Sequence, residues 1–287
     1  MRTHLLSWLL ALAAALPAAA QPNPEWTINH APFRIVGNVY YVGSNDLAAY
    51  LIATPRGHVL LNGNLPSSAP QIKQSIEQLG FRLADVKVLL SSQAHFDHAG
   101  GLAELKRLSG ARLAAMAPDA AALESGGRTD FFFYNDSSAW FPPVRVDRRL
   151  RDGDQVRLGG TTLTAHLTPG HTPGDTTWTL DVFADNRTYH VLIFGGSGVN
   201  TGNNLLHDSR YPQQAADLAR TFRVARQLPC DIFLGAHGVY FDLAAKYTRR
   251  QAAAQNPFLD PAGYQAYLTE SEEDFRAELT RQQAAAK

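Results

Sequence analysis

The chain has 287 residues with 26 basic and 26 acidic side chains, so its formal charge is zero. This balance disfavours binding to nucleic acid or anionic lipid, because no global field attracts either. With 45% hydrophobic and 18% charged residues, the chain can bury one large core or two small ones, which argues against a disordered or fibrous protein. The 10 histidines and single cysteine exclude a disulfide scaffold and a cysteine-based zinc module, leaving imidazole and carboxylate as the expected metal ligands.

The first 20 residues have the pattern of a secretory signal. Arg2 begins a basic start, an apolar run extends from Leu5 to Leu16, and Ala18-Ala19-Ala20 provides an A-x-A cleavage site. The apolar run is shorter than the ~20 residues that a membrane span needs, which disfavours a retained signal anchor. Residues 21–287 are therefore expected to form a single domain that is periplasmic or secreted and has no membrane attachment.

The next segment contains short β-branched and aromatic runs separated by turns. These runs predict antiparallel strands at residues 39–42, 50–53 and 59–61. Ser68 and Gln71 have the spacing of a capping box, and they predict the start of a helix that ends at Gly80. A further strand is expected at 86–91, and its Val-Leu-Leu run is apolar on both faces, which is typical of the buried middle of a sheet.

The rest of the chain partly repeats this order. Further strands are expected at residues 111–116, around 155–166, and at 176–182, 190–194 and 231–234. Further helices are expected near residues 102–108, 119–124, 213–228, 243–254 and 264–283. Two half-units of strands followed by alternating helices and strands predict an α/β fold, with a two-sheet core and helices outside it.

A cluster of metal-ligand residues directly follows the buried strand. Side chains two apart in an extended segment point the same way, so Gln93 and His95 can address one metal. Asp97 and His98 are adjacent at the turn and diverge, so they can reach a second centre.

Two more histidines occupy similar places. His171 lies in a loop rich in Pro and Gly, and His237 lies just after the strand 231–234. Loop tips above strand ends converge on one edge of a sheet, where sites usually form.

Together these motifs resemble the metallo-β-lactamase superfamily, and within it the third subclass of zinc β-lactamases. The family motif H-x-H-x-D-H is matched from position 93 except at its first residue, and residues 124–131 and 228–231 are also similar to that subclass. The resemblance covers most of the chain after residue 20. It implies a four-layer αββα sandwich of two mixed sheets, with helices on the outer faces, and two Zn²⁺ ions per chain.

The resemblance also implies which residues bind each zinc. The first zinc would be bound by Gln93, His95 and His171, and the second by Asp97, His98 and His237. Asp97 would also be catalytic, because it would orient the nucleophile. Five histidines match no ligand position and are expected in surface, strand or supporting roles: His30, His58, His166, His190 and His207.

Gln93 departs from the family motif. A neutral amide oxygen is a poorer zinc donor than an imidazole nitrogen, so the first site should bind zinc more weakly and fill after the second. Cys230, which relatives can pair with a cysteine near the C-terminus, has no partner in this chain and is expected to be a small buried residue.

The resemblance implies hydrolysis of β-lactam antibiotics, and hence antibiotic resistance. A tetrahedral zinc with an open position lowers the pKa of bound water to about 7, which supplies a nucleophile without serine or cysteine. The strained β-lactam ring lacks the planar amide resonance that protects ordinary peptide bonds. The expected partner is thus a small molecule, with no nucleic acid, and the protein is expected to be a monomer.

Substrate contacts are expected near Ser197, where the subclass places a serine that binds the drug carboxylate, and Asn200 is a second candidate. The aromatic Phe131–Phe141 loop has two interpretations: a hydrophobic wall over the metal edge, with Trp26 on the opposite rim, or side chains packed onto the body of the protein.

Two other functions stay open. One is another hydrolase of this fold, acting on lactones or thioesters. Such enzymes often have an extra carboxylate that bridges the metals. The stretch 194–197, where that carboxylate would be expected, has none. The other is an exported, non-catalytic zinc-binding protein whose first site has decayed at Gln93.

Overall fold

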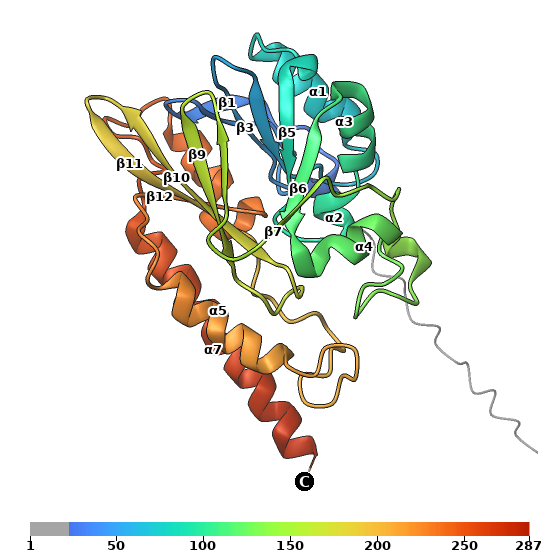
Figure 1. The fold of residues 1–287 in the computed structure, drawn as a ribbon. Helices are drawn as coiled ribbons and strands as arrows, with labels where there is room; N and C mark the ends of the chain where they lie inside the picture. The colour runs from blue at the N-terminus through green and yellow to red at the C-terminus, as the bar shows by residue number, and fades with distance from the viewer. Residues whose placement is uncertain (1–22, 287) are drawn as a thin grey trace, which may run out of the picture.

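The computed structural model describes residues 23–286, so the predicted signal at residues 1–20 lies outside the described residues. Two sheets pack face to face in the described chain (Figure 1). The first has the order β1-β2-β3-β4-β5-β6-β7. Its strands are β1 (Phe33–Val36), β2 (Val39–Tyr41), β3 (Tyr50–Ile52), β4 (His58–Leu61), β5 (Val86–Leu90), β6 (Arg112–Met116) and β7 (Arg148–Leu150). Pairing is antiparallel from β1 to β4 and parallel from β4 to β7, so this sheet is mixed.

The second sheet has the order β12-β11-β10-β9-β8. Its strands are β8 (Gln155–Leu158), β9 (Thr161–Leu167), β10 (Thr176–Ala184), β11 (Arg187–Phe194) and β12 (Ile232–Gly235). It is also mixed, because β11 and β12 are parallel while the other pairs are antiparallel. The predicted α/β class with two mixed sheets is confirmed.

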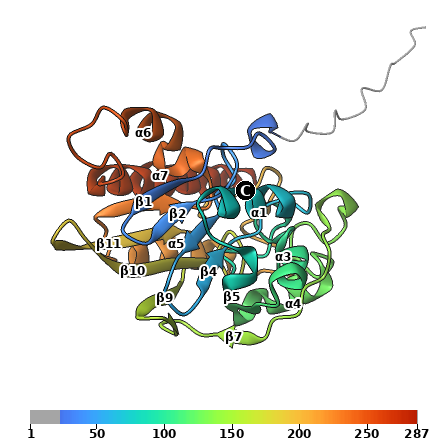
Figure 2. The same ribbon diagram turned by 90° about the horizontal axis from the view of Figure 1, so that it is seen from above.

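Helices cover the outer face of each sheet. Figure 2 shows α7 on one side of the molecule and α1 and α3 on the other. The helices are α1 (Ala69–Gln78), α2 (Phe96–Ala99), α3 (Leu102–Ser109), α4 (Ala120–Ser125), α5 (Gln214–Ala225), α6 (Leu243–Arg249) and α7 (Pro261–Ala285). Short 3₁₀ turns are η1 (Pro24–Trp26), η2 (Leu83–Asp85), η3 (Ala117–Asp119), η4 (Ser137–Ala139) and η5 (Gly238–Phe241).

The alternation of side chains along the strands divides the core into two clusters. In β4, Leu60 packs in the cluster that contains Ile72 of α1, whereas Leu61 packs in the cluster between the sheets that contains Trp178. Successive strand residues point to opposite faces, so the apolar run of this one strand serves both layers. The apolar runs of the sequence are thus explained by sheets that are covered on both faces.

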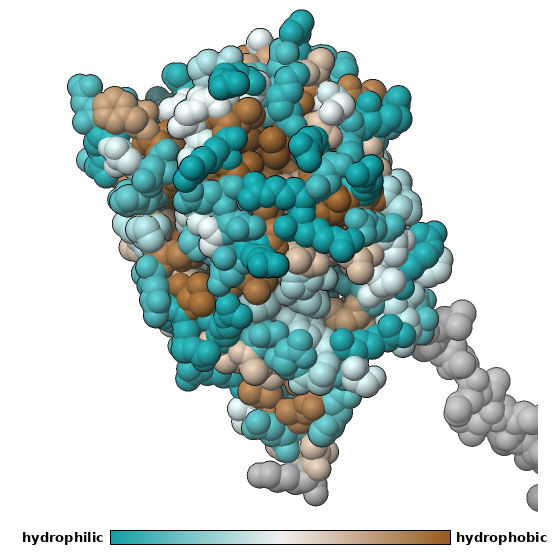
Figure 3. All heavy atoms as spheres, viewed as in Figure 1, coloured by the Kyte–Doolittle hydropathy of each residue, from teal (hydrophilic) through white to brown (hydrophobic). Residues whose placement is uncertain are grey.

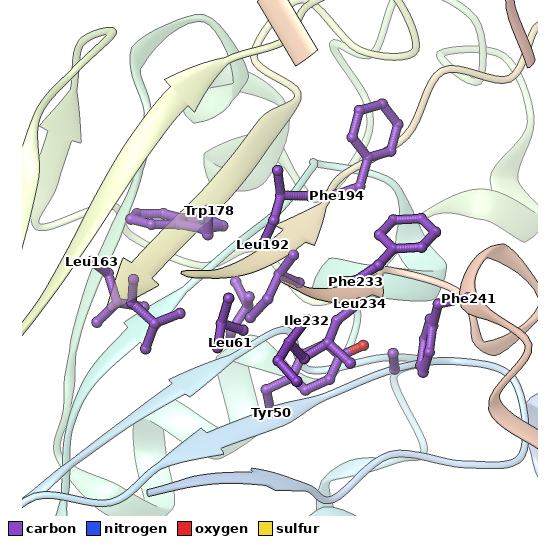
Figure 4. Close-up of a cluster of buried hydrophobic side chains, with 14 of the residues drawn as sticks. Tyr50, Leu61, Leu163, Trp178, Leu192, Phe194, Ile232, Phe233, Leu234 and Phe241 are labelled. Atoms are coloured by element: carbon purple, nitrogen blue, oxygen red, sulfur yellow. The ribbon is translucent and has the colours of Figure 1, made fainter. Parts of the chain in front are cut away.

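Direct hydrogen bonds also join the two sheets. The hydroxyl of Tyr50, in β3, donates to the carbonyl of Gly235 in β12 at 2.6 Å, and both residues are buried. Trp178 Nε1 donates to the Ser91 carbonyl at 3.1 Å, and the backbone N–H of Thr176 donates to the Ser92 carbonyl at 2.8 Å. Figure 4 shows Tyr50 and Trp178 among the apolar side chains between the sheets. The sheets are therefore fixed relative to each other where β5 and β12 end.

Three details differ from the sequence prediction. The capping box is wrong: α1 begins after Ser68, but the Ser68 side chain makes no capping hydrogen bond. Gln71 Nε2 instead donates to the carbonyls of Val42 and Gly43 and to the Ser75 hydroxyl, and the Ser68 N–H that a capping box would use donates to the Leu65 carbonyl. Strands β1 and β7 were not predicted, since each is short and lies at an edge of the first sheet.

Replacing Tyr50 with Phe should test the bond between the sheets. Tyr50→Phe keeps the ring and leaves the buried Gly235 carbonyl without its donor, so we expect a loss of about 1–3 kcal/mol in the free energy of unfolding. Chemical denaturation of the zinc-free protein measures this loss. Tyr189→Phe is the control, because the Tyr189 hydroxyl forms no hydrogen bond within residues 23–286. Equal losses in both variants would contradict the role of the Tyr50 hydroxyl.

Candidate metal centre

The six predicted ligands come from loops of both sheets. Gln93 and His95 follow β5, while Asp97 and His98 lie in the single turn of α2. His171 lies in the loop between β9 and β10, and His237 lies between β12 and η5. All six side chains therefore lie just beyond strand ends, with Asp97 and His98 in a short helix where a turn was expected.

Three of the six residues form a compact cluster. Asp97, His98 and His237 each offer one ligand atom, and these atoms all lie within 4.8 Å of one another. Asp97 Oδ2 lies 3.3 Å from His98 Nε2 and 3.5 Å from His237 Nε2. A carboxylate and two imidazoles at these separations can hold one divalent ion.

The other three residues meet beside this cluster. His95 Nδ1 lies 3.1 Å from His171 Nε2. Gln93 reaches the same place, because a Cβ built on Gly196 would lie 3.3 Å from both Gln93 Nε2 and His171 Cδ2. Both polar atoms of the Gln93 amide are buried without a hydrogen-bond partner in the described structure, so they are available to a ligand.

The electrostatics of the cluster favour a cation. Burial alone would raise the pKa of Asp97, but the imidazoles of His98 and His237 hold it far below its usual range, so the carboxylate stays ionised. Burial lowers the pKa of His98 to about 3, and burial beside His95 lowers that of His171 to about 4. Metal coordination requires a neutral imidazole, and these two side chains are already neutral at physiological pH.

The remaining two imidazoles are each held by a second carboxylate. His237 Nδ1 lies 3.0 Å from Asp46 Oδ2, and His95 Nε2 lies 3.5 Å from Asp130 Oδ2. Burial would lower the pKa of His237, but Asp46 and Asp97 outweigh it and raise that pKa to about 9. A carboxylate on the outer ring nitrogen fixes the orientation of a metal-binding imidazole and increases its basicity.

Both supporting carboxylates are themselves held in place. Asp46 accepts hydrogen bonds from Trp26 Nε1 at 2.9 Å and from the Val239 N–H at 3.0 Å. Asp130 accepts from the N–H groups of Phe132 and Phe133 at 2.8 and 2.6 Å. Sequence reasoning did not assign a role to either aspartate. Asp130 lies in a segment that carried the family resemblance, whereas nothing in the sequence around Asp46 marks it.

A buried pair of aspartates supports the loops next to the site. Asp119 accepts from Thr172 Oγ1 at 2.8 Å and from the Gly174 N–H at 2.6 Å, and burial raises its pKa to about 6. Asp175 accepts from the Gly196 N–H at 3.1 Å, and burial raises its pKa well above the usual range. These bonds position the His171 loop and the glycine that faces Gln93.

The predicted substrate contacts have different surroundings. Ser197 is buried and its Oγ has no hydrogen-bond partner within the described residues, while Asn200 is half-buried in the loop after β11. Within the aromatic loop, Phe133 lies over the centre, with its ring 5.0 Å from that of His95. Phe131 and Phe141 are buried, as the second interpretation of this loop expects. Trp26 does lie at the rim, with its ring 6.0 Å from that of His237.

The other histidines and the cysteine lie apart from the six residues. His30 packs against Phe33, His58 against Phe81, and His190 against Asp181. His166 bonds to Thr179 Oγ1 and His207 is exposed. Cys230 is free and half-buried, and burial raises the pKa of its thiol to about 12.

Comparison with known proteins identifies two groups of relatives. A sequence profile of the Metallo-beta-lactamase superfamily matches residues 46–237. The structure is similar to the FEZ-1 metallo-β-lactamase of Legionella gormanii, with 46% identity, coverage of 89% of this chain and 98% of that chain, and a TM-score of 0.88. It is also similar to BJP-1, a subclass B3 metallo-β-lactamase of Bradyrhizobium japonicum, with 38% identity, coverage of 92% and 99%, and a TM-score of 0.86.

The second group consists of curated sequences with another name. The hydroxyacylglutathione hydrolase of Rhodopseudomonas palustris strain BisB5 is 29% identical over 189 residues, which is 66% of this chain. The match spans 61% of the length of that relative.

Removing the charge of Asp46 should weaken metal binding. In Asp46→Asn the side chain no longer stabilises the imidazole of His237, so we expect zinc affinity at the Asp97 cluster to fall by about 10–100-fold. Competition with a chromogenic chelator measures this affinity. Asp181→Asn is the matched control, because Asp181 also bonds to a histidine, His190, at 2.8 Å but on the surface away from the cluster. Unchanged zinc affinity in Asp46→Asn would disprove the supporting role.

Proposed function

Because the chain belongs to the metallo-β-lactamase superfamily, a fold of metal-dependent hydrolases, we propose that it is a zinc-dependent β-lactamase. It would hydrolyse the cyclic amide bond of β-lactam antibiotics and thereby confer resistance to them. The observation that carries this proposal is the junction of the six ligand-type side chains, in a chain 46% identical to the Legionella gormanii β-lactamase over 98% of its length.

We propose two zinc sites, with ligands divided as the sequence suggests. Asp97, His98 and His237 would hold the tighter zinc, because they combine a carboxylate with two imidazoles. Gln93, His95 and His171 would hold the weaker one. The donor types fit zinc, and the buried, unpartnered nitrogens of His98 and the unpartnered amide of Gln93 leave ligand atoms free for it.

Zinc, when bound, would make water nucleophilic at neutral pH and polarise the carbonyl of the substrate. The side chains of the protein would position the water and the substrate. The carboxylate of Asp97, ionised and buried between His98 and His237, would orient the attacking water. Ser197 would bind the carboxylate of the drug through its free hydroxyl, and Asn200 would assist from the same loop. The ring of Phe133, above His95, would restrict the access of bulk water.

Space beside the first site favours a β-lactamase over other hydrolases of this fold. The bridging carboxylate expected of those enzymes would belong near residues 194–197. Here a Cβ on Gly196 would lie 3.3 Å from side-chain atoms of both Gln93 and His171, and a Cβ on Gly195 would clash with the Asp175 carboxylate. A side chain at position 195 would displace the Asp175 carboxylate, and one at position 196 would press on the side chains of Gln93 and His171.

Thioester hydrolysis is the second candidate function, because curated relatives are named hydroxyacylglutathione hydrolases. The match to them is weaker, at 29% identity over 61% of the relative. A non-catalytic zinc-binding protein is the third candidate.

We further propose that the protein acts in the periplasm or is secreted, as a monomer, on a small-molecule substrate. Within residues 23–286 no helix combines the length and apolar character needed to cross a membrane. On the face shown in Figure 3, hydrophobic patches are interrupted by hydrophilic residues. The zero formal charge supports action without nucleic acid.

A chromogenic cephalosporin separates the three candidates. The zinc-loaded protein should hydrolyse it, and a chelator should abolish the hydrolysis until zinc is restored. Asp97→Asn should remain folded by circular dichroism but lose most of the activity, because its amide is neutral and binds both zinc and water less well. Hydrolysis of a glutathione thioester without that of the cephalosporin would favour the second candidate. No hydrolysis of either with zinc present would favour the third.

Zinc titration should reveal the difference between the two sites. We expect two steps in the wild type, with the Asp97 cluster filling first. Gln93→His should raise the affinity of the later step by about ten-fold or more, because imidazole is the better donor. Isothermal titration calorimetry measures both steps. Equal affinities in the wild type, or no change in Gln93→His, would refute the assigned weakness of the amide ligand.

A further inference from the structure

A large cavity lies between the loop that carries Ser197 and the helix α7. Its volume is about 730 Å³. Residues 197–202 form one wall, Val239 and Tyr240 of η5 form a second, and residues of α7 from Tyr267 to Arg281 form the third. Most of this cavity has no role in the proposed metal sites or reaction.

The cavity adjoins the candidate metal centre on two sides. Ser197 directly follows Gly196, the residue that faces Gln93 and His171. On the other side, the ring of Tyr240 lies 5.0 Å from that of the ligand His237 and 4.9 Å from that of Tyr267. Ser197 and Tyr240 therefore belong both to the wall of the cavity and to the surroundings of the metal centre.

The wall formed by α7 is acidic. Glu270, Asp274 and Glu278 are spaced by four residues, so they lie on one face of the helix, and all three line the cavity. Arg281 also lines the cavity, but its guanidinium is bound to the Glu278 carboxylate by two hydrogen bonds of 2.7 and 2.6 Å. Within residues 23–286, Glu270 and Asp274 form no ion pair. Two carboxylates therefore remain uncompensated.

A second, independent feature indicates that the cavity holds a ligand. Ser197 lines the cavity and is only 2% exposed, and its Oγ has no hydrogen-bond partner in the described structure. A buried hydroxyl without a partner costs free energy unless a bound molecule satisfies it. The adjacent rings of Tyr240 and Tyr267 present apolar and π surface to the same space.

From these features we propose that the cavity is a subsite for a positively charged substituent of the substrate. This inference rests on the proposed β-lactamase function. Ser197 would bind the carboxylate of the drug, and the substituent next to that carboxylate would extend along the tyrosine pair toward Glu270 and Asp274. Aromatic faces and carboxylates together attract a quaternary ammonium or pyridinium group and disfavour an anionic one.

A matched pair of cephalosporins tests this subsite. The two drugs share one core, and the substituent beside the carboxylate is a quaternary ammonium in one and a neutral group of similar size in the other. In Glu270→Gln/Asp274→Asn we expect the ratio of kcat/KM for the cationic over the neutral drug to fall by about ten-fold, mainly through KM. Glu273→Gln is the control, because Glu273 lies on α7 but does not line the cavity, and its ratio should stay unchanged. An unchanged ratio in the double variant overturns the subsite.

A binding measurement keeps this result separate from the proposed function. Benzyltrimethylammonium should bind the zinc-free wild type, as followed by NMR, and should bind the double variant about ten-fold more weakly. Equal binding to both overturns the subsite, whatever the enzyme hydrolyses. Wild-type enzyme that hydrolyses neither cephalosporin with zinc present overturns the proposed function instead, and with it the role of the cavity for a drug.

Discussion

The hydrogen bonds that join the two sheets at one edge determine the geometry of the whole site. Ser91 and Ser92, which accept from Trp178 Nε1 and the Thr176 N–H, immediately precede Gln93. Gly235, which accepts from Tyr50, lies two residues before His237. The candidate ligands come from both sheets, so a shift of one sheet against the other would separate them. Buried hydrogen bonds resist such a shift, because breaking them leaves polar groups unsatisfied away from water.

The same edge gathers buried charge that the protein must compensate. Asp97 is buried, and the imidazoles of His98 and His237 keep it ionised. Asp46 and Asp130 extend this network. Each contacts the imidazole of a candidate ligand and also accepts hydrogen bonds from N–H groups. A buried ion is tolerated only when it is paired and hydrogen-bonded. The arrangement is therefore one network, in which the positions of the candidate ligands depend on carboxylates outside the six.

The parts of this network that the sequence predicts are those with a local signal. The apolar run at 88–90, followed by Gln93, His95, Asp97 and His98, identifies both the centre of a sheet and the candidate ligands at its end. Asp46 shows no such signal, because only the folded chain brings it to His237, 191 residues away. The capping box predicted at Gln71 is wrong for the opposite reason. Its local pattern is strong, but carbonyls from the β2–β3 turn compete for the Gln71 amide. Local patterns predict well until a distant group offers a better partner.

The inequality proposed for the two zinc sites has a cause beyond Gln93. The cluster of Asp97, His98 and His237 contains an ionised carboxylate, whereas Gln93, His95 and His171 are all neutral as ligands. Attraction between opposite charges is strongest where water is excluded, so a single buried carboxylate distinguishes the sites even with equal donors otherwise. Histidine at position 93 would improve the donor without adding negative charge. We therefore expect the order of filling to follow the position of Asp97 in the fold, and the size of the difference to follow the residue at position 93.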